Sequence, residues 1–145
     1  VAHVEIDAES RLDLVRRLSH EGVKVNVTAL MTGTQVEASA GALDGGAPAF
    51  VSMFAGRIAD AGIEPEPIMV AALDTLRPLP GIELIWASPR EILNIVQADR
   101  IGCHIITVTH DLLAKLHLLG RDLDEFSLDT VRMFHRDASA AGFTL

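Results

Sequence analysis

The chain has 145 residues, of which 49% are hydrophobic, and 20 acidic against 12 basic residues give a net charge of −8. This length suits one domain with a sizeable core and is too short for two ordinary ones, so we expect a single domain over residues 1–145. The acidic balance argues against nucleic acid or an anionic membrane surface as a partner. No apolar run reaches the roughly 20 residues that a membrane-spanning helix needs, and the start does not read as a secretory leader. We therefore expect a cytoplasmic protein.

The single cysteine, Cys103, cannot form an internal disulfide, which suits a reducing compartment. It lies in an apolar run of strand-forming residues. We expect a buried structural thiol here rather than a reactive one.

The amino-terminal part of the chain predicts two strands joined by a helix. Val1–Ile6 alternates and contains β-branched residues, which favours a strand. Asp7 or Ser10 then offers a cap for a helix that Gly22 closes. The run Val23–Leu30 is nearly apolar throughout, which is typical of a strand covered on both sides.

The next segment continues the alternation of helix and strand. Thr34 is expected to cap a short Ala-rich helix that ends near Leu43. Phe50–Asp60 is interpreted as a strand that ends in Arg57, whose planar fork of donors suits phosphate or carboxylate. Gly56 is expected to let the backbone come close to a ligand.

A loop that contains Pro65 and Pro67 is expected to lead into a helix that ends before Pro78. Ser88 is expected to cap a later helix, with Pro89 at its first helical position. The remaining elements are strands expected over 81–87 and 103–108 and helices expected over 111–118 and about 127–140.

This alternation, with no hairpin turn between any two strands, predicts an α/β fold with a parallel sheet of right-handed βαβ units. An open doubly wound sheet and a closed (β/α)8 barrel both fit the pattern. The chain contains no glycine-rich nucleotide fingerprint, which argues against the open-sheet cofactor folds.

Polar side chains gather at the expected carboxyl ends of the strands, where parallel α/β folds place their chemistry. They are Asn26, Thr28, Ser52, Arg57, Ser88 and Arg90. Two arginines, two serines and a helix amino terminus at Ser88 predict a phosphate site. The plainer interpretations are a surface pair between Arg57 and Asp60, a simple cap at Ser88 and a solvated Arg90.

Three of these runs also carry a resemblance to a known family. Glu21–Thr28, Ser52–Ile58 and Ala87–Arg90 fall at successive strand ends and together resemble the transaldolases, in particular the small group that includes fructose-6-phosphate aldolase. The order and spacing of the surrounding elements match from about Val1 to Ala141.

The resemblance implies a (β/α)8 TIM barrel of the class I aldolase type, of which this chain covers about strands four to eight and the helices that follow. Such enzymes cleave a ketose phosphate through a Schiff base on a lysine and pass a dihydroxyacetone unit to an aldose phosphate. The resemblance implies sugar phosphates as ligands, with no cofactor and no metal. The implied site residues are Asn26, Thr28 and Ser52 around the Schiff base, Phe54 where transaldolases proper carry phenylalanine, and Arg57, Ser88 and Arg90 around the phosphate.

The family pattern also places its lysine at or just before Val1–His3, where the nearest occupant is His3. A histidine cannot form an imine with a ketone. Lys24 is expected at the amino end of its strand and Lys115 on an outer helix. We therefore expect the nucleophile upstream of Val1, an inactive chain when alone, and either a homo-oligomer or a missing amino-terminal half-barrel as partner.

Three alternatives stay open. The chain could be a non-catalytic sugar-phosphate-binding barrel half that assembles with a partner chain, or belong to a fructose-6-phosphate aldolase-type lyase. It could also be a lysine-independent lyase that uses His3, His104 or His110 as a general base or as metal ligands.

Overall fold

The computed structural model describes residues 1–6 and 9–143, so the expected cap at Asp7 and the side chain of Ser10 lie outside the described residues. The chain divides into two compact units, Val1–Leu113 and Ala114–Leu145. The single domain expected over residues 1–145 stays a prediction.

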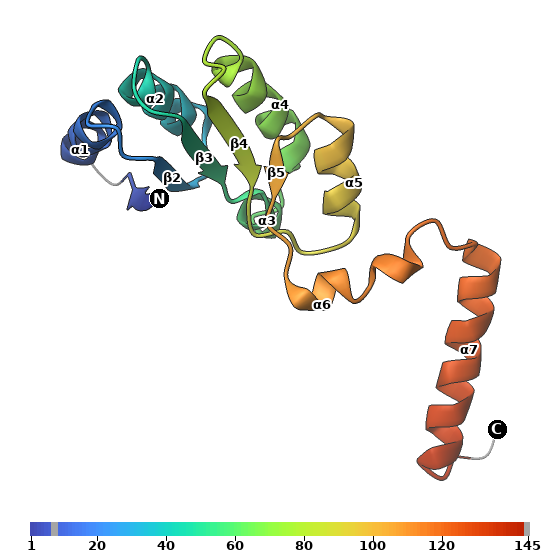
Figure 1. The fold of residues 1–145 in the computed structure, drawn as a ribbon. Helices are drawn as coiled ribbons and strands as arrows, with labels where there is room; N and C mark the ends of the chain where they lie inside the picture. The colour runs from blue at the N-terminus through green and yellow to red at the C-terminus, as the bar shows by residue number, and fades with distance from the viewer. Residues whose placement is uncertain (7–8, 144–145) are drawn as a thin grey trace. The chain divides into compact units, whose positions relative to one another are not determined.

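The first unit is a parallel α/β sheet (Figure 1). Its elements are β1 (Ala2–Glu5), α1 (Glu9–His20), β2 (Val25–Leu30), α2 (Gly33–Leu43), β3 (Ala49–Met53), α3 (Ala55–Asp60), α4 (Pro65–Leu76), β4 (Ile82–Trp86), α5 (Leu93–Arg100), β5 (Ile105–Ile106) and α6 (His110–Leu113). The strands pair in the order β1-β2-β3-β4-β5, every pair parallel. This sequential order is that of part of a (β/α)8 barrel, as expected from the sequence.

One face of the sheet forms the hydrophobic core. The strand residues on this face that have exposed fractions of 0% are Val25, Val27, Val51, Met53, Leu84 and Trp86. In Figure 1 α1, α2 and α4 lie side by side along the sheet, and their buried side chains, such as Val15, Val36 and Met69, complete this core. Trp86 is therefore a core residue, and its bulky side chain takes up no space on the opposite face of the sheet.

The opposite face carries the alternate residues of each strand, because successive side chains point to opposite sides. The register aligns His3 with Asn26, Asn26 with Phe50 and Phe50 with Glu83. His3, Asn26 and Glu83 thus lie on one face together with Phe50, and Ser52 follows two residues after Phe50 on the same face. The polar side chains of the sheet are therefore on this face, opposite the apolar core.

Two helix starts differ from the expectation. Thr32, not Thr34, caps α2: its hydroxyl accepts the N–H of Gln35, whose side chain accepts the N–H of Thr32 in return. Pro65 is not in a loop but at the first position of α4, where its missing N–H costs no helical hydrogen bond.

The carboxyl ends of β3 and β4 also differ from the expectation. The strand that begins the Phe50–Asp60 run ends at Met53, and the rest of that run forms the short helix α3, so Arg57 is helical. Ser88 does not cap a helix, because its backbone is in the left-handed region at φ 60° and α5 begins only at Leu93. Both corrections concern the loops that hold the expected phosphate residues.

β5 is shorter than the strand expected over 103–108. Side chains take over the hydrogen bonds to β4 that a longer strand would make. The N–H of Leu84 donates to Nδ1 of His104 at 3.1 Å, and Cys103 Sγ lies 3.5 Å from the carbonyl oxygen of Leu84. The thiol is partly buried, and this burial raises its pKa, as expected for a structural cysteine.

The second unit contains a 3₁₀ turn, Leu116–Leu118, and α7 (Leu123–Ala140). The helix expected over 111–118 is thus replaced by α6 and this turn. α7 begins earlier than residue 127, because the Asp122 carboxylate caps it by accepting the N–H groups of Asp124 and Glu125. None of the described helices is both long and apolar enough to cross a membrane.

Candidate active site

A hydrogen-bonded row of side chains crosses β1, β2 and β3 on the open face of the sheet. Ser52 Oγ donates to Asn26 Oδ1 at 2.8 Å, and Asn26 Nδ2 lies 3.2 Å from His3 Nδ1. Asn26 and Ser52 have exposed fractions of 8% and 3%, whereas His3 is exposed. The row therefore holds two predicted site residues rigidly and presents a third polar side chain at its open end.

The other two residues expected near the reacting carbons extend this row toward the carboxyl ends of the strands. Thr28 is half-buried and pairs in register with Glu5. Phe54 follows β3 directly, and the guanidinium carbon of Arg57 lies 5.7 Å from the centre of its ring. Phe54 thus lies between the hydrogen-bonded row and Arg57, one of the expected phosphate residues.

Arg57 and Arg90 line one hollow of about 530 Å³, together with Met31, Asp60 and Ala61. Arg57 comes from α3 and Arg90 from the loop between β4 and α5. Both side chains are exposed. The two arginines that the sequence singled out are therefore brought to the same place, and two guanidinium groups at one hollow suit an anion.

Ser88 is held against α3 by a close approach of two backbones. A Cβ on Gly56 would lie 1.5 Å from the carbonyl oxygen of Ser88 and 3.2 Å from Arg90 Nε. The N–H of Gly56 donates to the carbonyl of Ala87 at 3.4 Å. Gly56 was expected to let the backbone approach a ligand, but it lets the loop after β4 approach α3 instead. This contact places Ser88 beside the arginines.

Asp60 is a residue of this site that the sequence did not assign. Its carboxylate accepts hydrogen bonds from Nε of Arg90, at 3.2 Å, and from Nη2 of Arg90. The surface pair considered from the sequence joined Asp60 to Arg57 instead, because only local spacing was visible. Arg90 has five N–H donors and this pair uses two of them, so donors at the end of its fork are left for an anion.

Asn94 supports the loop from below and was also not foreseen. Its side chain is buried, and Oδ1 accepts the N–H groups of Arg90 at 2.8 Å and Glu91 at 3.2 Å. Asn94 Nδ2 donates to Gln97 at 2.9 Å. The backbone of Arg90 is therefore fixed by Asn94 while its side chain is fixed by Asp60.

Lys24 is placed at the amino end of its strand as expected, whereas Lys115, expected on an outer helix, lies in a turn. Lys24 immediately precedes β2, and its ammonium lies 4.1 Å from the centre of the Phe50 ring, at the amino end of the sheet. Lys115 belongs to the second unit, just before the 3₁₀ turn, and is exposed. Neither stands at the carboxyl end of a strand.

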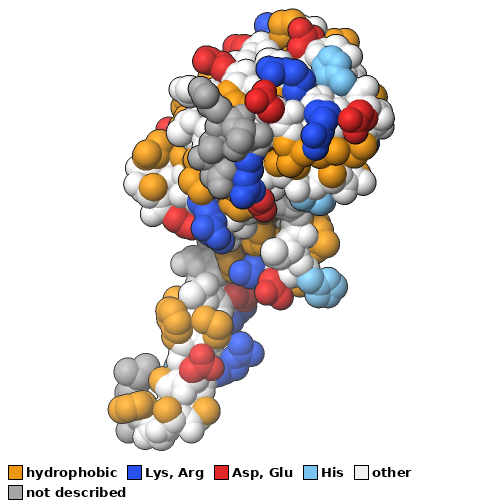
Figure 2. All heavy atoms as spheres, turned by 90° about the vertical axis from the view of Figure 1, so that its left-hand side faces the viewer, with side chains coloured by type: hydrophobic (Ala, Val, Ile, Leu, Met, Phe, Trp, Pro, Cys, Tyr) orange, Lys and Arg blue, Asp and Glu red, His pale blue; other side chains and the backbone are white. Residues whose placement is uncertain are grey.

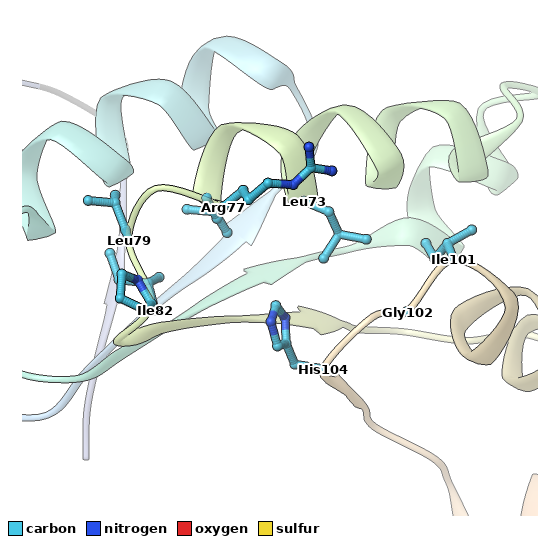
Figure 3. A pocket seen from close by; sticks show the side chains of 9 residues that line it. Leu73, Arg77, Leu79, Ile82, Ile101, Gly102 and His104 are labelled. Atoms are coloured by element: carbon cyan, nitrogen blue, oxygen red, sulfur yellow. The ribbon is translucent and has the colours of Figure 1, made fainter.

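A second cavity, of about 300 Å³, lies near the amino end of β4 (Figure 3). Leu73 of α4 and Arg77, which follows this helix, line it together with Ile101 and His104. Figure 3 shows the guanidinium of Arg77 turned away from His104, and Arg77 pairs with Asp74. His104 uses Nδ1 to accept the N–H of Leu84, so its contact is a structural one.

The sequence also raised a metal site as an alternative and argued against nucleic acid as a partner. Within residues 1–6 and 9–143, no three His, Cys, Asp or Glu side chains are grouped so that they could hold a metal ion. On the face drawn in Figure 2, acidic and basic side chains are interspersed rather than gathered by sign.

Comparison with known proteins identifies the family. The model of the transaldolase/fructose-6-phosphate aldolase family matches residues 8–145. A protein named "Probable transaldolase" from Thermodesulfovibrio yellowstonii is 36% identical over 115 residues, which are 74% of this chain and 49% of that protein. "Probable transaldolase 2" of Listeria monocytogenes is 35% identical over 112 residues, 74% of this chain and 48% of that protein.

The chain therefore spans about half the length of these curated relatives. Since the family model covers nearly all of it, the chain belongs to the transaldolase/fructose-6-phosphate aldolase family.

Proposed function

We propose that this chain supplies the sugar-phosphate-binding part of a transaldolase-type active site. In the complete barrel, a dihydroxyacetone unit would pass between sugar phosphates through a Schiff base. The observation that carries the proposal is the meeting of Arg57 and Arg90 at one hollow, at the carboxyl ends of β3 and β4. This is the end of the sheet at which barrel enzymes hold their substrates.

In this proposal, the phosphate lies in the hollow between Arg57 and Arg90, with Ser88 beside it. Arginine suits this role because its guanidinium gives charge-assisted and often bidentate hydrogen bonds to phosphate. The carbon chain of the sugar lies across Asn26, Thr28 and Ser52, whose amide and hydroxyl groups suit sugar hydroxyls. Phe54 closes one side of the site and favours transfer over the lyase reaction of fructose-6-phosphate aldolase.

The nucleophilic lysine is proposed to come from outside residues 1–145. Lys24 lies at the amino end of β2, so it is not placed to attack a ketose bound at the carboxyl ends of the strands. We propose that three further βα units complete the barrel in the cytoplasm, within one polypeptide or from a partner chain.

A second candidate function is sugar-phosphate binding without turnover. The placement of Lys24 at the amino end of β2 favours it, because imine formation requires an amine near the substrate carbonyl. This function would keep the roles of Arg57, Ser88 and Arg90 unchanged. It differs from the first only in what the complete assembly does with the bound sugar.

Calorimetric titration of the chain with fructose 6-phosphate tests the site. Arg57→Gln is expected to weaken binding by about 2 kcal/mol, roughly thirtyfold in Kd, because a charged hydrogen bond is lost. Arg77→Gln is the matched control, since Arg77 is an exposed arginine near the amino-end cavity and should leave Kd unchanged. Equal affinity of the Arg57→Gln variant and the unaltered chain would remove Arg57 from the phosphate site.

The complete gene product then separates the two functions. Transfer of a three-carbon unit from fructose 6-phosphate to an aldose phosphate supports the transaldolase proposal. Tight binding without transfer supports the binding module.

A further inference from the structure

We propose that His3 donates a hydrogen bond from Nε2 to an oxygen of the bound sugar, and that Asn26 and Ser52 fix it in the tautomer that can do so. The inference rests on the proposed function, because it names a further contact in the same site. It starts from the hydrogen-bonded row His3–Asn26–Ser52, which phosphate binding by the arginines does not require.

The direction of the hydrogen bonds determines the tautomer. Ser52 Oγ donates to Asn26 Oδ1, so the amide oxygen of Asn26 faces β3 and its NH₂ group faces β1. An NH₂ group can only donate, so Nδ1 of His3 must accept. A neutral imidazole that accepts at Nδ1 carries its proton on Nε2.

The Nε2–H group of His3 is available to a ligand. His3 is exposed on the open face of the sheet, and within the described residues Nε2 has no hydrogen-bond partner. Asn26 and Ser52 are buried, so the Nε2–H group of His3 is the solvent-exposed donor of the row. The site thus carries one fixed neutral N–H donor.

The position of this donor suits the carbon chain of a sugar phosphate. His3 is in register with Asn26, and Ser52, Phe54 and then Arg57 follow along β3 and α3. Ser52 is in β3 and Arg57 is in the helix that follows this strand, so the row and the arginine hollow succeed one another toward the carboxyl ends of the strands. A ligand with a phosphate at one end and hydroxyl or carbonyl oxygens along its chain can reach both, whereas inorganic phosphate cannot.

The role of His3 is therefore to orient the sugar or to polarise its carbonyl by a hydrogen bond. A neutral imidazole is suited to donate to an oxygen that gains negative charge during reaction. No bond to His3 forms or breaks in this role.

Two variants of His3 separate its two ring nitrogens. His3→Asn keeps an acceptor near the Nδ1 position, which preserves the contact with Asn26, and removes the donor at Nε2. His3→Gln places an amide near the Nε2 position and can donate there. We expect His3→Asn to weaken fructose 6-phosphate binding three- to tenfold, His3→Gln to recover at least part of the loss, and neither to change the affinity for inorganic phosphate.

Nitrogen-15 NMR of the imidazole rings supplies a readout that a purely structural role would not move. The free chain should show His3 as the Nε2–H tautomer, and fructose 6-phosphate should shift its Nε2 and attached proton. His20, at the end of α1, is the control and should stay unchanged.

An Nδ1–H tautomer, or equal affinities of the two His3 variants for fructose 6-phosphate, would overturn the inference. If fructose 6-phosphate left the Nε2 signal of His3 unchanged while its binding still depended on Arg57, this inference alone would be overturned. Failure of the complete barrel to bind fructose 6-phosphate would overturn both the inference and the proposed function.

Discussion

Gly56 and Ser88 bring two loops of the site into direct backbone contact, because a Cβ at position 56 would lie 1.5 Å from the carbonyl oxygen of Ser88. Gly56→Ala forces this backbone to move, since a carbonyl cannot rotate away as a flexible side chain can. We expect the free energy of unfolding in urea to fall by about 2 to 3 kcal/mol.

Gly41→Ala is the matched control for this substitution. Gly41 lies inside α2, and a Cβ there would have no atom within 4 Å. Alanine in the interior of a helix should raise the free energy of unfolding by about 0.5 to 1 kcal/mol. Similar changes of stability in both variants would show that the approach of Gly56 to Ser88 is not tight.

Asp60→Asn tests how the carboxylate affects the arginine hollow. Asp60 and Arg90 have side chains that are 54% and 49% exposed, so loss of their ion pair should change the free energy of unfolding by less than about 1 kcal/mol. The variant removes a negative charge next to the proposed phosphate, so Kd for fructose 6-phosphate should fall by about two- to fivefold. Weaker binding would mean that Asp60 acts mainly by orienting Arg90.

His104 is predicted to stabilise the edge of the sheet through Leu84. His104→Ala leaves the buried N–H of Leu84 without an acceptor, which should cost about 1 to 3 kcal/mol of unfolding free energy. His104→Asn offers an oxygen near the position of Nδ1 and should retain most of the stability. Equal losses in the two variants would contradict the role of this hydrogen bond.

Cys103 is predicted to lower the free energy of unfolding as the pH rises into the alkaline range. Burial raises the pKa of its thiol in the folded chain, so the unfolded chain ionises first as the pH rises. The contribution of the buried thiol to the free energy of unfolding is complete below the ordinary thiol pKa of about 8.5. It is lost as the pH rises from there through the raised pKa of the folded chain. Melting temperatures at pH 7 and 9.5 should therefore differ more for the unaltered chain than for Cys103→Ala, and identical differences would contradict this assignment.

Much of the fold could be predicted from the sequence, because the signals that decide it are local. The alternation of apolar strands with amphipathic helices gave the parallel sheet, and the three motif runs gave the family. The cap of α2 was also readable, since Thr32 and Gln35 have the spacing of a capping box. The expectation at Thr34 overlooked this spacing.

The loops of the site could not be predicted, because contacts between distant segments determine them. Ser88 and Pro89 look like a helix start, but Ser88 packs against Gly56 and Asn94 holds the following N–H groups, so α5 starts later. The pairing of Asp60 with Arg90 depends in the same way on two loops meeting. The candidate residues were thus foreseen, and their supporting contacts were not. Their roles stay predictions.

The most direct test of a sugar-phosphate site at the carboxyl ends of the strands is a map of backbone amide shifts as fructose 6-phosphate is added to the chain. We expect shifts at Arg57, Ser88 and Arg90 and at Asn26 and Ser52, with the amide signals around Arg77 and His104 unchanged. Shifts confined to the cavity at the amino end of β4, or the same shifts with unphosphorylated fructose, would contradict this expectation.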